Sequence, residues 1–274
     1  MKKIISLASL IVLAVVAAMF VFGDSATMSV SIGNTAPTVE SVTIKEGSTI
    51  NPAQGSDKTI TIEALISDTN GYIDITGVTA YFVGANIPTN GADSGMVIGS
   101  CTQYDSIRKN CTKTYNMKFY DNPVVYTINV TATDALSNKA NKTGSFTYNS
   151  LKALHLDAAS IDFGTMTAGS SSSVLGDTSM ATTSNATIQN EGNVAINVGM
   201  NATNFISGSD TILVTNAGYR FSGTSYIMFT GSKVTEAIGL AKGAASYNKI
   251  DFNLTVPVGS AAGSYTSTVY VTAE

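Results

Sequence analysis

The sequence predicts an all-β protein built from two antiparallel β-sandwiches. The first observation is that apolar residues recur at every second position in several stretches, among them 59–67, 124–132, 194–200 and 250–256. Because side chains of a strand point alternately to opposite faces, each stretch predicts a strand with one buried and one wet face. The second observation is that Gly, Asn and Pro turns separate these stretches, which is typical of sandwiches rather than of a parallel sheet. Beyond the first 23 residues, only 234–242 is a candidate helix, and it is short.

The first half of the chain contains about seven predicted strands, the number expected of one immunoglobulin-like sandwich. The expected spans are 38–46, 58–68, 74–83, 95–104, 111–120, 123–134 and 142–150. A second set begins near residue 160 and ends with 265–273, after a short connector at 151–159. The predicted organisation is a leader at 1–26, an immunoglobulin-like β-sandwich at 36–152 and a second β-sandwich at 153–274.

The N-terminus has the pattern of an export signal. Lys2 and Lys3 precede an uncharged, mostly apolar run, residues 4–23. A short basic region ahead of such a run is typical of a secretory signal peptide, and about 20 apolar residues are also enough to span a bilayer. Two alternatives therefore stand, a cleaved signal peptide and a membrane anchor retained through residues 4–23. Either one places the following residues outside the cytoplasm, so we expect a secreted or cell-surface protein.

The composition argues against nucleic acid as a partner. Charged residues make up 12% of the chain, against about 25% in an average soluble domain. The formal net charge is −4, and without Lys2 and Lys3 the remaining 13 basic and 19 acidic residues give −6. A weakly charged, acidic chain does not attract a polyanion.

Several turn and strand-edge motifs resemble those of a known group of proteins. In the first half these are Asn34–Val39, Asp68–Ile75 and Val130–Asp134, and in the second half they are Ile161–Thr165, a predicted hairpin at Gln189–Val194 and Val256–Thr266. The chain resembles exported archaeal cell-surface proteins with tandem immunoglobulin-like β-sandwich domains. The resemblance implies a structural or adhesive role at the cell surface and carries over no catalytic residues.

Cys101 and Cys111 are the only cysteines, and the export signal places them where disulfides persist. They flank a short segment between two predicted strands, so we expect a structural disulfide that closes a hairpin. A disulfide that closes a loop of this size stabilises the folded state by about 3 kcal/mol. The alternative is a redox or metal pair, but no further Cys and no nearby His accompanies them.

Acidic residues form the best candidate site. Asp68, Asn70 and Asp74 lie in the turn after the second predicted strand, and Asp134 and Asn138 lie after the sixth. In an immunoglobulin-like sandwich these two loops emerge at the same end, so their oxygens can converge. Calcium takes six to eight hard oxygen ligands, which these side chains supply. Calcium at Asp68, Asn70, Asp74 and Asp134 is the one metal hypothesis, and local turn chemistry is the alternative.

Six N-x-S/T sequons make the chain a candidate glycoprotein. They lie at Asn110, Asn129, Asn141, Asn185, Asn201 and Asn253. Serine and threonine are so abundant that their number alone proves nothing. On the predicted strands, Asn129, Asn201 and Asn253 fall on the polar face, where a glycan is tolerated.

Catalysis has no support in the sequence. His155 is the sole histidine, and no nucleophile or second metal ligand can be assigned to it. No phosphate loop, nucleophile elbow or zinc motif occurs. We therefore expect a non-catalytic surface protein with a structural or adhesive role, as an envelope, S-layer-associated or filament component that contacts other surface proteins or itself. The alternative is an extracellular carbohydrate-binding module, calcium-dependent or not.

Overall fold

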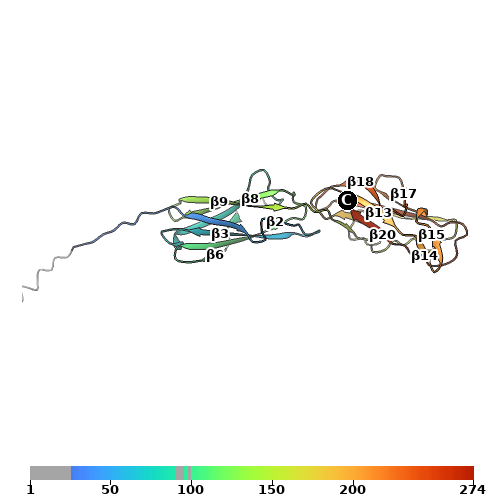
Figure 1. The fold of residues 1–274 in the computed structure, drawn as a ribbon, viewed down its shortest axis with the longest axis horizontal. Helices are drawn as coiled ribbons and strands as arrows, with labels where there is room; N and C mark the ends of the chain where they lie inside the picture. The colour runs from blue at the N-terminus through green and yellow to red at the C-terminus, as the bar shows by residue number, and fades with distance from the viewer. Residues whose placement is uncertain (1–25, 90–95, 98–99) are drawn as a thin grey trace, which may run out of the picture. The chain divides into compact units, whose positions relative to one another are not determined.

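The computed structural model describes residues 26–274 except 90–95 and 98–99. In these residues the fold is all-β, and the only helical segments are two single 3-10 turns, η1 (Tyr72–Asp74) and η2 (Val214–Asn216). All strand pairs among the described residues are antiparallel except β2 with β9, which is parallel. The predicted all-β class is confirmed, and the layered sheets are consistent with β-sandwiches (Figure 1).

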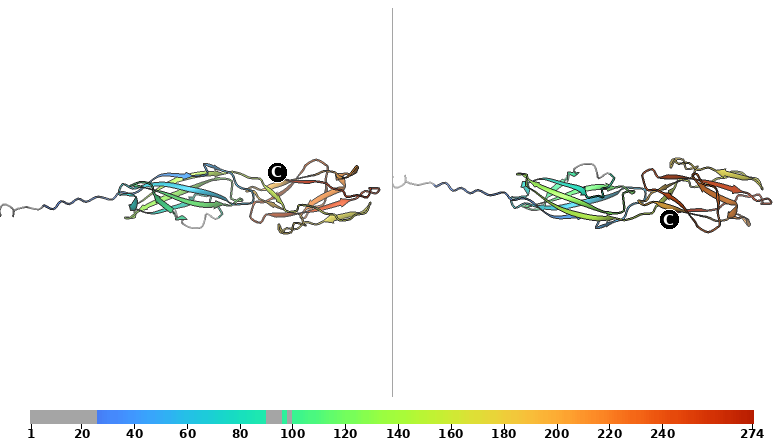
Figure 2. Two further views of the ribbon diagram at one scale, coloured as in Figure 1. Left: turned by 90° about the horizontal axis from the view of Figure 1, so that it is seen from below. Right: turned by 90° about the horizontal axis from the view of Figure 1, so that it is seen from above.

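Strands β1 to β9 form two sheets that enclose the first core. Their order is β1-β3-β7-β6 in one sheet and β2-β9-β8-β4-β5 in the other. The strands are β1 (Thr38–Ile44), β2 (Thr49–Ile50), β3 (Lys58–Ser67), β4 (Ile75–Val83), β5 (Met96–Val97), β6 (Ser100–Gln103), β7 (Arg108–Met117), β8 (Val125–Asp134) and β9 (Lys139–Tyr148). Figure 2 gives two further views of them.

The first core is filled by the apolar face that the sequence periodicity predicts. Every second residue of β3 from Ile60 to Ile66 is fully buried, and the residues between are half-buried. Tyr115, Phe119 and Tyr126 are buried as well. Tyr126 stacks on Phe146 with ring centroids 5.6 Å apart. Aromatic packing of this kind adds to the burial energy.

Strands β10 to β20 surround a second hydrophobic core. One sheet has the order β10-β12-β19-β16-β17 with β11 also paired to β19, a second has the order β18-β13-β20, and β14 pairs with β15. The strands are β10 (Leu154–Leu156), β11 (Ser171–Val174), β12 (Thr187–Asn190), β13 (Ile196–Ala202), β14 (Phe205–Ser207), β15 (Asp210–Ile212), β16 (Ala217–Phe221), β17 (Ile227–Met228), β18 (Val234–Leu240), β19 (Tyr247–Thr255) and β20 (Val269–Ala273). Tyr219 and Phe221 are the largest fully buried side chains here.

Three local predictions are wrong. The helix candidate at 234–242 is strand β18, which pairs antiparallel with β13. The predicted hairpin at Gln189–Val194 does not exist, because β12 and β13 belong to different sheets and the segment between them crosses from one to the other. His155 lies in strand β10 rather than in a free connector.

Residues Thr35–Glu274 form one compact unit, and the described residues before Thr35 are not part of it. Within the larger unit the two hydrophobic cores share no residue. The division at 152/153 into two domains stays a prediction. The leader at 1–26, with its apolar run 4–23, lies almost entirely outside the described residues. In the part of the chain that the structure describes, no helix has the length and apolar character needed to cross a membrane.

Candidate calcium site

Three aspartates from distant parts of the sequence meet at one end of the first core. Asp68 directly follows β3, Asp74 ends η1, and Asp134 is the last residue of β8. One carboxylate oxygen from each lies within 4.8 Å of those of the other two. Strands β3 and β8, both labelled in Figure 1, belong to the two different sheets around the first core. The group of carboxylates therefore links these sheets at one end.

Local backbone geometry aims these carboxylates at one another. The N–H of Gly71 donates to the carbonyl oxygen of Asp68 at 3.0 Å, and that of Asp74 donates to the carbonyl oxygen of Gly71 at 3.0 Å. Gly71 has a φ of 113°, which a residue with a side chain rarely adopts. The resulting tight turn returns Asp74 toward Asp68. Across the sheet, Ile75 pairs with Asp134, which brings the third carboxylate alongside.

Among the described residues, two carboxylate oxygens of the group are buried without a hydrogen-bond partner. Asp68 is 2% exposed, and its Oδ1 accepts from the N–H of Asn70 at 2.8 Å. The Oδ2 atoms of Asp68 and Asp74 are buried and have no hydrogen-bond partner among the described residues. Asp134 is also 2% exposed, and its two oxygens accept from the N–H and the Nδ2 of Asn138 at 2.8 and 2.9 Å. Buried polar atoms are nearly always satisfied, so these two oxygens are the positions at which the predicted calcium ion would be held.

Electrostatics favours a cation between these oxygens. Two ionised carboxylates whose oxygens lie 4.8 Å apart, the upper limit in this group, repel each other by roughly 3 kcal/mol at an effective dielectric constant of about 20. The neighbouring Lys109 donates its Nζ to the carbonyl oxygen of Ile75 at 2.7 Å and lies 6.0 Å from the ring centre of Tyr72. Calcium binds oxygens at about 2.3–2.6 Å, so two of its ligands are at most about 5 Å apart. The 4.8 Å limit of the group satisfies this requirement.

The structure brings together three of the four predicted calcium ligands. Asn70 is exposed, and its Oδ1 accepts from the N–H and the hydroxyl of Thr35, both at 2.8 Å. It contributes its backbone N–H to Asp68 instead. Sequence reasoning also missed the segment 105–107, which supports the turn through the carbonyl oxygens of Ser106 and Ile107. Backbone acceptors carry no residue-type signal, so no sequence motif identifies them.

Calcium is expected to stabilise the sheets around the first core by about 2 kcal/mol at 10 mM, because extracellular calcium modules typically bind with Kd of about 10⁻⁴–10⁻³ M. For a chain of this size that raises Tm by about 4–8 °C relative to excess chelator. Asp74→Asn should abolish the response and, in chelator, should not lower Tm, since it removes repulsion. Asp210→Asn, an exposed aspartate in β15, is the control and should keep the full response. An identical Tm in calcium and in chelator for the wild type would rule the site out.

Cys101 and Cys111 form a disulfide and lie directly opposite each other on β6 and β7. Cys111 is fully buried in the first core, whereas Cys101 is exposed. The bond therefore ties the edge strand β6 to a strand that contributes to the core. With both sulfurs bonded, neither is free to act as a thiolate nucleophile or a metal ligand.

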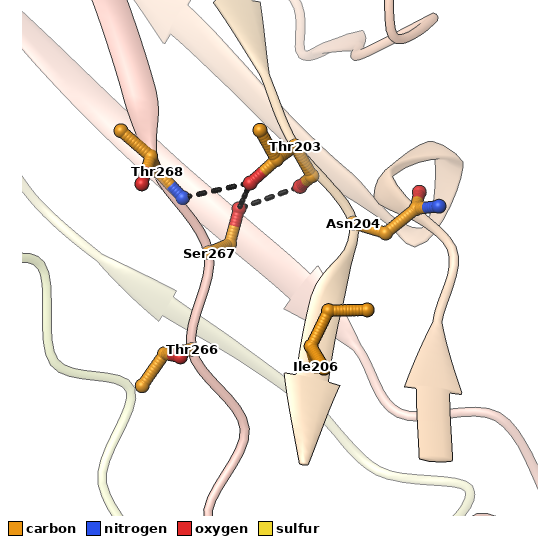
Figure 3. Close-up of a pocket in the computed structure, with 6 residues that line it drawn as sticks. All are labelled: Thr203, Asn204, Ile206, Thr266, Ser267 and Thr268. Carbon is orange, nitrogen blue, oxygen red and sulfur yellow. Dashed lines mark hydrogen bonds between the residues drawn. The ribbon is translucent and has the colours of Figure 1, made fainter. Parts of the chain in front are cut away.

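A polar hollow of about 380 Å³ lies beside β14. It is lined by Thr203, Asn204, Ile206, Thr266, Ser267 and Thr268 (Figure 3). Its hydroxyl groups largely bond to the surrounding chain: the Ser267 hydroxyl donates to the carbonyl oxygen of Thr203 at 2.6 Å, and the Thr203 hydroxyl accepts from the N–H of Thr268 at 3.0 Å. The lining contains no aromatic ring and no charged group, which are the usual anchors for a small ligand.

The six sequon asparagines differ in accessibility. Asn141 is exposed, and the other five, Asn110, Asn129, Asn185, Asn201 and Asn253, are half-buried. The Nδ2 of Asn110 donates to Glu63 at 2.6 Å, and the Oδ1 of Asn253 is buried. Glycosylation remains a prediction, with Asn141 as the most accessible acceptor.

No family model and no curated protein matches this chain. Among solved structures, a chain of the CsuC–CsuE chaperone–tip adhesion subunit pre-assembly complex from the archaic chaperone-usher Csu pili of Acinetobacter baumannii is similar over 83% of this chain and 97% of its own length, at 13% identity and a TM-score of 0.39. A chaperone–tip adhesin complex of CFA/I fimbriae biogenesis is similar over 87% and 83%, at 9% identity and a TM-score of 0.31. A carbohydrate-binding module of the β-sandwich superfamily is similar over 88% and 98%, at 14% identity and a TM-score of 0.29. With TM-scores below 0.5, these likenesses define no function.

Proposed function

We propose that this chain is an exported, non-catalytic cell-surface protein with a structural or adhesive role, built from two tandem immunoglobulin-like sandwiches behind a signal peptide or anchor. The observation that carries the proposal is the disulfide between Cys101 and Cys111. Disulfides persist outside the cytoplasm and are rare inside it. The basic residues and apolar run at the N-terminus support the same location.

The placement of the reactive side chains supports a non-catalytic role. His155, the sole histidine, is exposed on the short strand β10. Both cysteines are bonded to each other. A Cys–His pair of nucleophile and base therefore lacks its free thiol, and a Ser–His pair lacks a histidine in a protected site.

The placement of the aromatic rings supports a structural role over sugar binding. The most deeply buried tyrosines, Tyr126, Tyr148 and Tyr219, are at most 1% exposed and fill the two cores. Among the described residues the exposed tyrosines are Tyr81, Tyr104 and Tyr270, which come from β4, the loop after β6 and β20. A sugar platform needs several exposed rings side by side. Within the acidic group Asp68 and Asp134 are buried and Asp74 is half-buried, so bound calcium would strengthen the fold rather than offer open positions to a sugar.

The test of the proposed function is the location and redox state of the native protein. Cells that produce the chain are treated with protease and with a membrane-impermeant alkylating reagent before lysis, and the chain is then analysed by mass spectrometry. We expect cleavage in intact cells and a Cys101–Cys111 peptide pair that is alkylated only after reduction. An intracellular chain with both thiols free would contradict the proposal. Binding to a glycan array would favour the carbohydrate-binding alternative.

A further inference from the structure

Strand β20 has an unpaired outer edge. It lies at the end of the sheet β18-β13-β20 and, among the strands that the structure describes, pairs only with β13 (Figure 1). The N–H and C=O of Glu274 both bond to Asn197, at 3.0 and 3.1 Å. Because successive residues of a strand direct these groups to opposite sides, those of Val271 and Ala273 point away from β13. Within the described residues, no strand pairs with that side.

The side chains of β20 that face the core are incompletely covered. In β13 the core-facing Val198 and Met200 are fully buried. Their partners across the pair, Ala273 and Val271, pack against the same core but remain partly exposed. The second core has many such partly buried apolar residues, whereas in the described part of the chain Val42 and Val124 are the two that pack against the first core. One more strand beside β20 would cover this side of the second core.

The opposite edge of the same sheet is protected. Glu236 of β18 pairs with Val198 and so points inward, where its Oε1 accepts from the hydroxyl of Tyr219 at 2.9 Å. An inward-pointing charge is a common means of preventing strand addition at an edge. By contrast, residues 265–273 contain no charged residue. Of the two edges, only β20 is free of such protection.

The same chain carries a segment with the properties of an unpaired strand. In Ala26–Ile32, apolar Met28, Val30 and Ile32 alternate with Thr and Ser. These three side chains are 95%, 87% and 82% exposed, and the segment belongs to no strand of the structure. Such alternation predicts a strand with one buried face, and here that face is not buried. The segment is also uncharged, so it can pair with β20 without burying a charge.

We propose that residues 26–32 of one copy add as a strand to the outer edge of β20 in a second copy. Main-chain hydrogen bonds to Val271 and Ala273 would supply the pairing, and the apolar face of the donor would cover the exposed side of the second core. The inference deepens the proposed structural role and rests on it, since it gives a surface component a means of self-assembly.

The short reach of residues 26–34 favours pairing with β20 of a second copy over pairing with β20 of the same copy. The N–H of Thr35 is held by Asn70 beside the end of β3, where β1 begins. The chain leaves the first sandwich after Tyr148, which pairs with Ile50 beyond the other end of β1. The ten residues of β3 span about 33 Å between these ends. Residues 26–34 reach at most roughly 30 Å, which is too short to pass the first sandwich and lie along β20.

The arrangement predicts open chains of copies. Donor and acceptor are different surfaces of one molecule, so the contact is head to tail. Such contacts form filaments unless the rotation between copies closes a ring. Each copy in the chain would accept one strand and donate one.

The first test compares self-association of the full exported chain with that of Val30→Asp and Ser29→Asp by sedimentation velocity and electron microscopy. Val30→Asp places a charge on the apolar face and should weaken association by roughly 100-fold. Ser29→Asp adds the same charge to the polar face and should leave association near that of the wild type. A wild type that stays monomeric, a Val30→Asp chain that assembles normally, or equal losses in both variants would each overturn the proposal.

The second test locates the contact by disulfide trapping between differently tagged copies. Ser29→Cys is introduced in one copy and Tyr270→Cys in the other, because both positions lie on the outward faces of the proposed pair. We expect a cross-link between the two tags, and none within a dilute chain that carries both substitutions. A cross-link confined to one copy, or none between copies, would overturn strand exchange. Neither result bears on surface location or on the native disulfide, which are measured separately.

Discussion

Replacing Cys101 and Cys111 together by alanine is expected to lower the free energy of unfolding by about 3 kcal/mol. The disulfide joins residues ten positions apart, and closing a loop of this size restricts the unfolded chain by about that amount. The bond also holds the edge strand β6 against β7, whose Cys111 is fully buried. Its loss should therefore loosen β6 first.

Denaturant unfolding of the double variant and of the wild type with and without reductant measures this effect. The reductant should lower the midpoint of the wild type to near that of the variant, and it should leave the variant itself unchanged. A wild type whose midpoint is the same in both conditions would show that the bond contributes nothing to stability.

Asp251→Ala is expected to cost about 3 kcal/mol in the second half of the chain. Asp251 has no exposed surface, and its Oδ2 accepts from Arg220 at 2.9 Å and from Lys249 at 3.2 Å. Its Oδ1 accepts from the N–H of Gly176 at 2.9 Å. Removing the carboxylate leaves that N–H without its acceptor and two cations without their counter-ion. Since both cations are partly exposed and can be hydrated, the expected loss of stability lies at the lower end of that for a broken buried ion pair.

The contribution of Asp251 should also depend on pH. Burial alone would raise the pKa of this carboxyl, but the hydrogen bonds from Arg220, Gly176 and Lys249 outweigh it and hold the pKa below its ordinary value. A carboxyl with a lowered folded-state pKa stabilises the fold fully above its unfolded pKa, about 3.9, and loses that contribution as pH falls through the folded value. The difference between wild type and Asp251→Ala should thus be constant above about pH 5 and shrink below about pH 4.

Asp210→Ala is the matched control for this measurement, because Asp210 is an exposed aspartate of β15. It should change stability by less than about 0.5 kcal/mol at any of these pH values. A difference between wild type and Asp251→Ala that grows toward low pH would contradict the assigned ionisation.

The sequence by itself determined the strands of the first half well. Period-two alternation is a local property, so residues 58–67 show both their strand and their buried face without any partner. Cysteine count and the export signal likewise led to a disulfide from sequence alone. The sequence also predicted that Asp68, Asp74 and Asp134 converge, because the two loops that contain them emerge at the same end of a sandwich.

The features that depend on which segment lies beside a strand were decided only by the tertiary structure. The segment after Gln189 has the turn residues of a hairpin, yet it crosses between sheets, since turn chemistry is the same in both cases. Asp251 lies on the face of β19 that alternation predicts to be wet, but Arg220 and Gly176 approach from other elements and bury it. The open edge of β20 and the exposed face of residues 26–32 are also invisible to local patterns. Burial is a property of what packs against a side chain, and the chain brings those partners from far along the sequence.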